Sequence, residues 1–149
     1  MTDPILAARI CVVDDQPANL RLLERVLARS GFEDVRSFID PHEALAAIEA
    51  NGPDLLLLDL HMPGLDGFAF LEALGGPPAT GRSLPVLVMS GDIDKAARSR
   101  ALAAGAADFL AKPFDVAEVV LRVRGLIGSY QLYKAGTEAT PRADDTPPT

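Results

Sequence analysis

Residues 55–59 read LLLLD, four leucines in a row that end at an aspartate. A short apolar run of this kind, bounded by polar residues, is typical of a strand that is buried on both faces. Two further runs have the same form, ICVV at 10–13 and PVLVM at 85–89, and each also ends at a polar side chain. Three such strands in one chain favour a parallel sheet with helices on both faces.

Helical patterns separate the strands. Segment 17–30 begins with a proline, which suits the first turn of a helix, and continues with leucines at spacings of three and four. Strand and helix alternate in this way along the chain, which predicts an α/β fold with a doubly wound five-stranded parallel sheet. The predicted strands are 10–13, 32–38, 55–58, 85–89 and 107–111; the predicted helices are 17–30, a segment from its N-cap Asp40 through Ile48, 67–74, 94–104 and 115–128; and 75–84 is a turn-rich loop.

Composition limits the class of protein. The chain has 149 residues, of which 48% are hydrophobic and 23% are charged, as in a single soluble globular domain. Its net charge of −7 argues against binding nucleic acid or a membrane surface through bulk positive charge. Cys11 is the single cysteine, so an internal disulfide is impossible. We find no secretion signal and no apolar run of about 18 residues, and therefore expect a cytoplasmic protein.

The two ends of the chain differ from its centre. Residues 1–8 are expected to be a ragged start, and the segment from about Gly136, with three prolines and no apolar residue larger than alanine, is expected to be disordered. Leu126, near the end of the last predicted helix, and Tyr130 and Tyr133 beyond it keep helical spacing. They fit either a continuation of that helix, as a linker or dimer contact, or a frayed end weakened by glycines. We therefore predict a domain at 9–128, with a helical extension and tail at 129–149.

Polar side chains follow four of the predicted strands. Asp14 and Asp15 come after the first strand, Asp59 after the third, Ser90 after the fourth and Lys112 after the fifth. The carboxyl ends of parallel strands share one edge of the sheet, and open α/β sheets bind their ligands there. If the first and third strands are neighbours, three carboxylates lie within reach of one point.

This set of side chains suits phosphoryl chemistry. Clustered carboxylates repel one another unless a cation lies between them, and oxygen ligands without histidine or cysteine favour Mg²⁺. A lysine ammonium suits an anionic phosphoryl group, and a carboxylate can itself be the nucleophile that forms an aspartyl phosphate. The pattern therefore predicts Mg²⁺-assisted transfer of a phosphoryl group to an aspartate.

Four segments carry a family resemblance. VVDDQPANLRLLERVL at 12–27, LLLLDLHMPGLDGF at 55–68, LVMSGD at 87–92 and AGAADFLAKPF at 104–114 resemble the receiver domain of two-component response regulators. The resemblance extends from about Arg9 to Ile127. It implies a flavodoxin-like fold with strand order 2-1-3-4-5, and a phosphorylation-controlled binding module rather than an enzyme.

The resemblance also implies roles for the residues at the strand ends. Asp59 would accept a phosphoryl group from a histidine kinase or a histidine phosphotransfer protein. Asp15 would bind Mg²⁺ directly and Asp14 largely through water, while His61 would contribute its backbone carbonyl. Lys112 would bind a phosphoryl oxygen, and its peptide bond to Pro113 is expected to be cis.

Two further residues would form a switch. Ser90 would move to hydrogen-bond the phosphoryl group, and Phe109 would swing inward as Ser90 moves. The change would alter the surface made by the fourth helix, the fifth strand and the fifth helix, where a downstream protein, an output domain or a second copy would bind. Phe109 also fits a plain core position. Ser90 could instead cap the fourth helix, although Asp92 is the better cap.

Two other functions compete with this interpretation. A phosphatase or phosphotransferase of the haloacid dehalogenase type also forms an aspartyl phosphate, but it places a DxDx[TV] motif after the first strand, where this chain has DDQP at 14–17. A constitutive interaction domain would normally lack the acceptor or the lysine, and both are present. No helix-turn-helix or other DNA-reading motif is found, so direct binding to nucleic acid is not expected.

Overall fold

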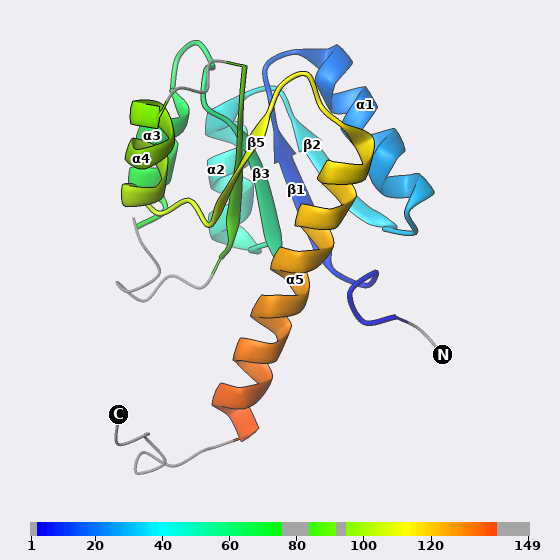
Figure 1. Cartoon of the computed structure of the whole chain (residues 1–149). Helices are drawn as coiled ribbons and strands as arrows, with labels where there is room; N and C mark the ends of the chain where they lie inside the picture. The colour runs from blue at the N-terminus through cyan, green and yellow to red at the C-terminus, as the bar shows by residue number, and fades with distance from the viewer. Residues whose placement is uncertain (1–2, 76–83, 92–94, 140–149) are drawn as a thin grey trace.

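The computed structural model describes residues 3–75, 84–91 and 95–139. They form a five-stranded parallel sheet in the order β2-β1-β3-β4-β5, with helices on both faces (Figure 1). This confirms the predicted fold class and strand order. The elements are β1 Arg9–Val13, α1 Pro17–Arg29, β2 Asp34–Phe38, α2 Pro41–Ala50, β3 Leu55–Asp59, α3 Gly67–Ala73, β4 Val86–Ser90, α4 Lys95–Ala103, β5 Asp108–Ala111 and α5 Val116–Ala139.

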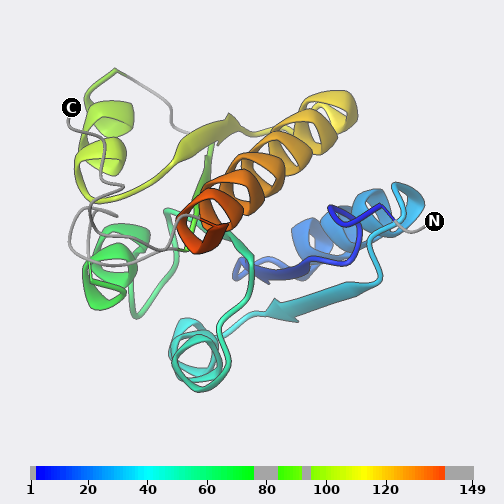
Figure 2. The ribbon, with the colours of Figure 1, turned by 90° about the horizontal axis from the view of Figure 1, so that it is seen from below.

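The sheet divides the apolar interior into two clusters. Helices α1 and α5 cover one face, while α2, α3 and α4 cover the other (Figure 2). Leu55 and Leu57 of β3 lie in the first cluster and Leu56 and Leu58 in the second, and all four are fully buried. Successive side chains of a strand point to opposite faces, so a strand between two helical layers needs apolar residues at every position.

Helix ends follow the predicted signals in several places. Pro17 begins α1 at its first turn, and the Asp40 carboxylate caps α2 by accepting a hydrogen bond from the His42 backbone N–H at 2.9 Å. Asp66 caps α3 in the same way, by accepting from Ala69 N–H at 2.8 Å. Gly105, with φ of +117°, follows α4 and takes a left-handed conformation that suits glycine.

Some predicted boundaries shift. The second strand was expected to begin at Phe32, but β2 begins at Asp34 because Phe32 N–H instead bonds to Leu27 O at 3.0 Å and closes the end of α1. The fourth strand lies one residue later than predicted, since Pro85 has no N–H to give the ladder while Ser90 O still accepts from Lys112 N–H at 2.9 Å. The predicted Asp92 cap and most of the predicted 75–84 loop lie outside the described residues.

Helix α5 is longer than the predicted 115–128. It runs without a break to Ala139 and projects past the sheet (Figure 1). Of the two alternatives for residues after 128, a continued helix and a frayed end, the continued helix is therefore correct. Residues 136–139, which we expected in the disordered tail, are therefore helical. Ile127 is the last α5 residue in the first core cluster. Within the described residues, no helix has the length and apolar character needed to cross a membrane.

Residues 3–8 are packed against the domain, so the prediction of a ragged start is wrong for this segment. Ala8 is buried, and Ile5 and Leu6 pack against the first core cluster. The sequence pattern missed this segment because it is too short to show a period.

Leu57→Ala tests the two-sided burial of β3. The side chain is fully buried at the centre of the sheet, so its truncation should lower the free energy of unfolding by about 3 kcal/mol. Urea-induced unfolding measures the change. Leu121→Ala is the matched control because Leu121 is 73% exposed, and it should change stability by less than about 0.5 kcal/mol. Equal losses for both variants would contradict the assignment of β3 as the core strand.

Candidate functional site

Three carboxylates meet at the carboxyl edge of the sheet. Strands β1 and β3 are neighbours with Val13 opposite Leu58, so the residues that follow, Asp14 and Asp59, lie side by side. One carboxylate oxygen each from Asp14, Asp15 and Asp59 lies within 4.8 Å of the others. Asp14 is fully buried, Asp59 is 3% exposed and Asp15 is half-buried. The structure therefore brings together the three acidic residues that the sequence singled out.

Lys112 provides positive charge at the same point. Its Nζ lies 3.1 Å from Asp14 Oδ2 and 3.4 Å from Asp59 Oδ1. The residue follows β5 and is held in place by its backbone N–H, which donates to Ser90 O. The Lys112-Pro113 peptide bond is cis, as expected. One ammonium group thus lies within ion-pair distance of two buried carboxylates.

Asp14 has further partners. Its Oδ1 accepts a hydrogen bond from the Gln16 backbone N–H at 2.9 Å, and its Oδ2 accepts from Asn19 Nδ2 at 3.3 Å. We did not identify Asn19 from the sequence. The available signal was an amide side chain in the first turn of the helix that follows the Asp pair, where it can reach back to the strand end. These donors fix the buried carboxylate in one orientation.

The backbone after Asp59 is held close to the carboxylate. His61 N–H donates to Asp59 Oδ1 at 3.2 Å, and the His61 side chain is exposed. Gly67 N–H donates to Leu60 O at 2.9 Å, and a Cβ at Gly67 would lie only 2.6 Å from Leu60 Cα. Only glycine permits this approach, so Gly67 lets the start of α3 fold back against the strand end that carries Asp59.

Burial changes the acidity of Asp59. The pKa of the Asp59 carboxyl is raised from 3.8 to about 6. Loss of hydration is the largest cause and the neighbouring Asp14 charge acts in the same direction, whereas the His61 N–H bond and Lys112 partly oppose the rise. The ionised form is therefore costly in the folded protein when no further cation is present.

Ser90 ends β4, the neighbour of the strand that ends at Asp59, and Phe109 lies on β5. Ser90 is fully buried, and Phe109 is 3% exposed and belongs to the second core cluster. The Arg98 guanidinium of α4 lies 5.5 Å from the centroid of the Phe109 ring, and Arg100 stacks on Phe68 of α3 at 3.8 Å. The Phe109 ring thus lies inward, which both the switch and the plain-core interpretations allow.

Cys11 lies apart from this site, on β1. It is 5% exposed in the second core cluster, and burial raises the pKa of its thiol to about 12. The thiol is protonated at neutral pH and acts as a small apolar side chain.

Comparison with known proteins agrees with this geometry. The response regulator receiver domain family matches residues 10–124. The chain belongs to this family. This receiver is 42% identical over 121 residues to the response regulator PleD of Caulobacter vibrioides, covering 81% of the chain and 26% of PleD. It is also 42% identical over 127 residues to the transcriptional regulatory protein PrrA of Mycobacterium tuberculosis, covering 85% of the chain and 53% of PrrA. The receiver therefore spans a quarter to a half of these relatives.

Solved structures give the same result. The receiver domain of the Francisella response regulator 1452 is 28% identical, with a TM-score of 0.74 over 82% of this chain and 98% of that one. NtrX from Brucella abortus is 31% identical, with a TM-score of 0.79 over 89% of this chain and 29% of that one. The protein is thus a receiver domain of two-component response regulators, a signalling family rather than a classical enzyme family.

Asp59→Asn tests the electrostatics of the site. With a chelator present, Asp59 in the folded state should hold more protons than in the unfolded state between pH 3.8 and about 6. Wild-type stability should therefore fall as pH rises through this window, by at most about 3 kcal/mol, and Asp59→Asn should lack this fall. Chemical unfolding at a series of pH values measures it.

Asp66→Asn is the matched control, because asparagine also caps a helix and Asp66 lies outside the acidic cluster. It should keep the wild-type pH profile. A constant stability difference between wild type and Asp59→Asn from pH 4 to pH 7 would show that burial does not raise the Asp59 pKa.

Proposed function

We propose that this receiver accepts a phosphoryl group on Asp59 and that phosphorylation changes its binding surface. The observation that carries the proposal is the meeting of Asp14, Asp15 and Asp59 with the Lys112 ammonium at the carboxyl edge of the sheet. Like charges are brought together there at a cost in stability, which is typical of a site built for chemistry.

The donor set fits Mg²⁺. It offers oxygen ligands and no thiolate or imidazole, since Asp14, Asp15 and Asp59 contribute carboxylates and the His61 imidazole is exposed. In the proposal these carboxylates and the His61 backbone carbonyl hold the ion. When bound, Mg²⁺ neutralises the clustered negative charge and offsets charge on a phosphoryl oxygen.

The transfer step is a displacement at phosphorus. One Asp59 carboxylate oxygen forms a bond to phosphorus while the bond from phosphorus to the donor breaks, and the donor atom keeps the electron pair of that bond. Lys112 Nζ lies 3.4 Å from Asp59 Oδ1, and in the proposal it binds an oxygen of the incoming group. A histidine kinase or histidine phosphotransfer protein in the cytoplasm is the proposed donor, and water attacking the same phosphorus would release phosphate.

The proposed readout involves Ser90 and Phe109. Ser90 ends β4 beside Ala111 of β5, and Phe109 pairs with Val88 two positions earlier in the same ladder. A hydrogen bond from the Ser90 hydroxyl to the phosphoryl group would shift this strand end, and the Phe109 ring would transmit the shift to Arg98 on α4. The α4-β5-α5 surface would then bind a downstream protein, an output domain or a second copy, with phosphorylation biasing a two-state equilibrium.

Intact-mass spectrometry tests the acceptor. The protein incubated with Mg²⁺ and acetyl phosphate should gain one phosphoryl adduct, because the Asp59 carboxylate is the proposed nucleophile. The adduct should be absent in Asp59→Asn and in wild type with chelator, and should persist in the control Asp66→Asn. An adduct at wild-type level in Asp59→Asn would refute the acceptor assignment.

Lys112→Ala tests the role of the ammonium. Removing it should slow adduct formation roughly 10- to 100-fold, as expected when one positioned charge is taken from a transition state. A time course of the same mass measurement gives the rate. Lys95→Ala is the control, since Lys95 is exposed on α4 and should react at the wild-type rate. Equal rates for the two variants would remove Lys112 from the proposed chemistry.

A further inference from the structure

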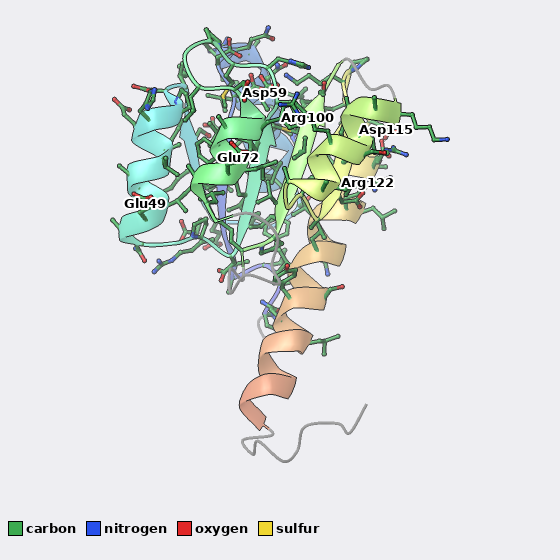
Figure 3. All side chains as sticks on the ribbon, turned by 90° about the vertical axis from the view of Figure 1, so that its left-hand side faces the viewer. Glu49, Asp59, Glu72, Arg100, Asp115 and Arg122 are labelled. Carbon is green, nitrogen blue, oxygen red and sulfur yellow. The ribbon has the colours of Figure 1, made fainter. Side chains whose placement is uncertain are left out.

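The segment of residues 3–8, here called the N-terminal strap, lies against the projecting helix α5. It enters β1 at the amino edge of the sheet, so it is at the opposite end of the strands from Asp59, as Figure 3 shows for Asp59 and the α5 extension. The proposed phosphorylation chemistry does not use the contacts of this segment.

Polar contacts tie the strap to two positions of α5 that lie two helical turns apart. The Asp3 carboxylate accepts a hydrogen bond from Arg124 Nη2 at 2.9 Å, and the Pro4 carbonyl accepts from Gln131 Nε2 at 3.0 Å. The Asp3 carboxylate also accepts from the Ile5 backbone N–H at 3.0 Å, which closes the strap into a turn. The donors Arg124 and Gln131 lie seven residues apart and share one face of the helix.

Two glycines lie close to the apolar side chains of the strap. A Cβ at Gly128 of α5 would lie 3.4 Å from Ile5 Cδ1. A Cβ at Gly31, which follows α1 with φ of +101°, would lie 2.9 Å from Leu6 Cδ1. Ile5 therefore packs onto α5 and Leu6 onto the end of α1, and both join the first core cluster. The strap links the two helices that cover this face of the sheet.

Helix α5 needs such support beyond Ile127. The first core cluster contains no α5 residue after Ile127, and the Leu132 side chain is 77% exposed to solvent. A projecting helix of about 12 residues is marginal by itself in water, and glycine costs it about 1 kcal/mol per position. Gly128 lies in this part of α5, and Gly125 lies just before it. The strap contacts fall at Arg124, Gly128 and Gln131, which is where the helix leaves the sheet.

We propose that the N-terminal strap is a positioning device that keeps the first turns of the α5 extension helical and fixes the direction in which α5 leaves the receiver. Anything joined to or bound by the end of α5 then has its orientation set by residues 3–6. The strap would control this orientation independently of the acceptor site, since the two lie at opposite edges of the sheet.

Hydrogen exchange of the full chain tests the helical part of the proposal. In the double variant Ile5→Ala/Arg124→Ala, amides of residues 128–132 should exchange about tenfold faster or more, while those of β1 and β3 should keep their protection. Arg122→Ala is the matched control. It removes the Arg122 ion pairs with Asp108 and Glu118 on the same helix but leaves the strap in place. Wild-type protection of 128–132 in the double variant would overturn the proposal.

Spin-label distances test the direction of α5. Labels on Arg25→Cys of α1 and Leu132→Cys of α5, both exposed positions, should give a narrow distance distribution that broadens in the double variant. An unchanged distribution would also overturn the proposal. Acetyl phosphate labelling of the double variant should match wild type, so a failure of the strap and a failure of the Asp59 acceptor give different results.

Discussion

Two carboxylates, those of Asp14 and Asp59, lose almost all contact with solvent at one edge of the sheet. The free energy of burying two like charges has to be offset by groups that the rest of the fold must place. Lys112 comes from the end of β5, donors to Asp14 come from the start of α1, and the donor to Asp59 comes from the loop that precedes α3. The two carboxylates can thus be buried only if the strand order and the helix starts place these groups correctly.

Much of this arrangement is predictable from the sequence because strong local signals specify it. The unbroken run at 55–58 fits a strand between two helical layers, and it ends at Asp59, the proposed acceptor. Parallel strands bring their ends to one edge, so the side chains that follow them converge without any knowledge of detailed packing. Asp40 was also recognisable as a helix start, because capping depends on a neighbour two residues away.

Other features depend on contacts between distant residues and leave no periodic signal. Asp3 and Arg124 are 121 positions apart, and neither is unusual in its own segment. Phe32 is apolar and next to a strand, yet its backbone closes α1 because Gly31 turns the chain there. The Asn19 contact with Asp14 and the position of Arg98 over Phe109 depend on how a helix rotates against the sheet. Glycines at 125 and 128 argued for a frayed end, but tertiary contacts override helix propensity.

The sheet has a mechanical consequence for how this receiver can transmit a signal. Its two apolar clusters share no side chain, and adjacent residues of β5, Phe109 and Leu110, belong to different clusters. A rearrangement around Phe109 and α4 can therefore repack one compartment while the other, which holds α5, keeps its packing. Arg122 of α5 pairs with Asp108 of β5, which gives α5 a polar contact with the strand that carries Phe109. The sheet thus separates the two apolar compartments, and the Arg122–Asp108 ion pair lies on its edge strand β5.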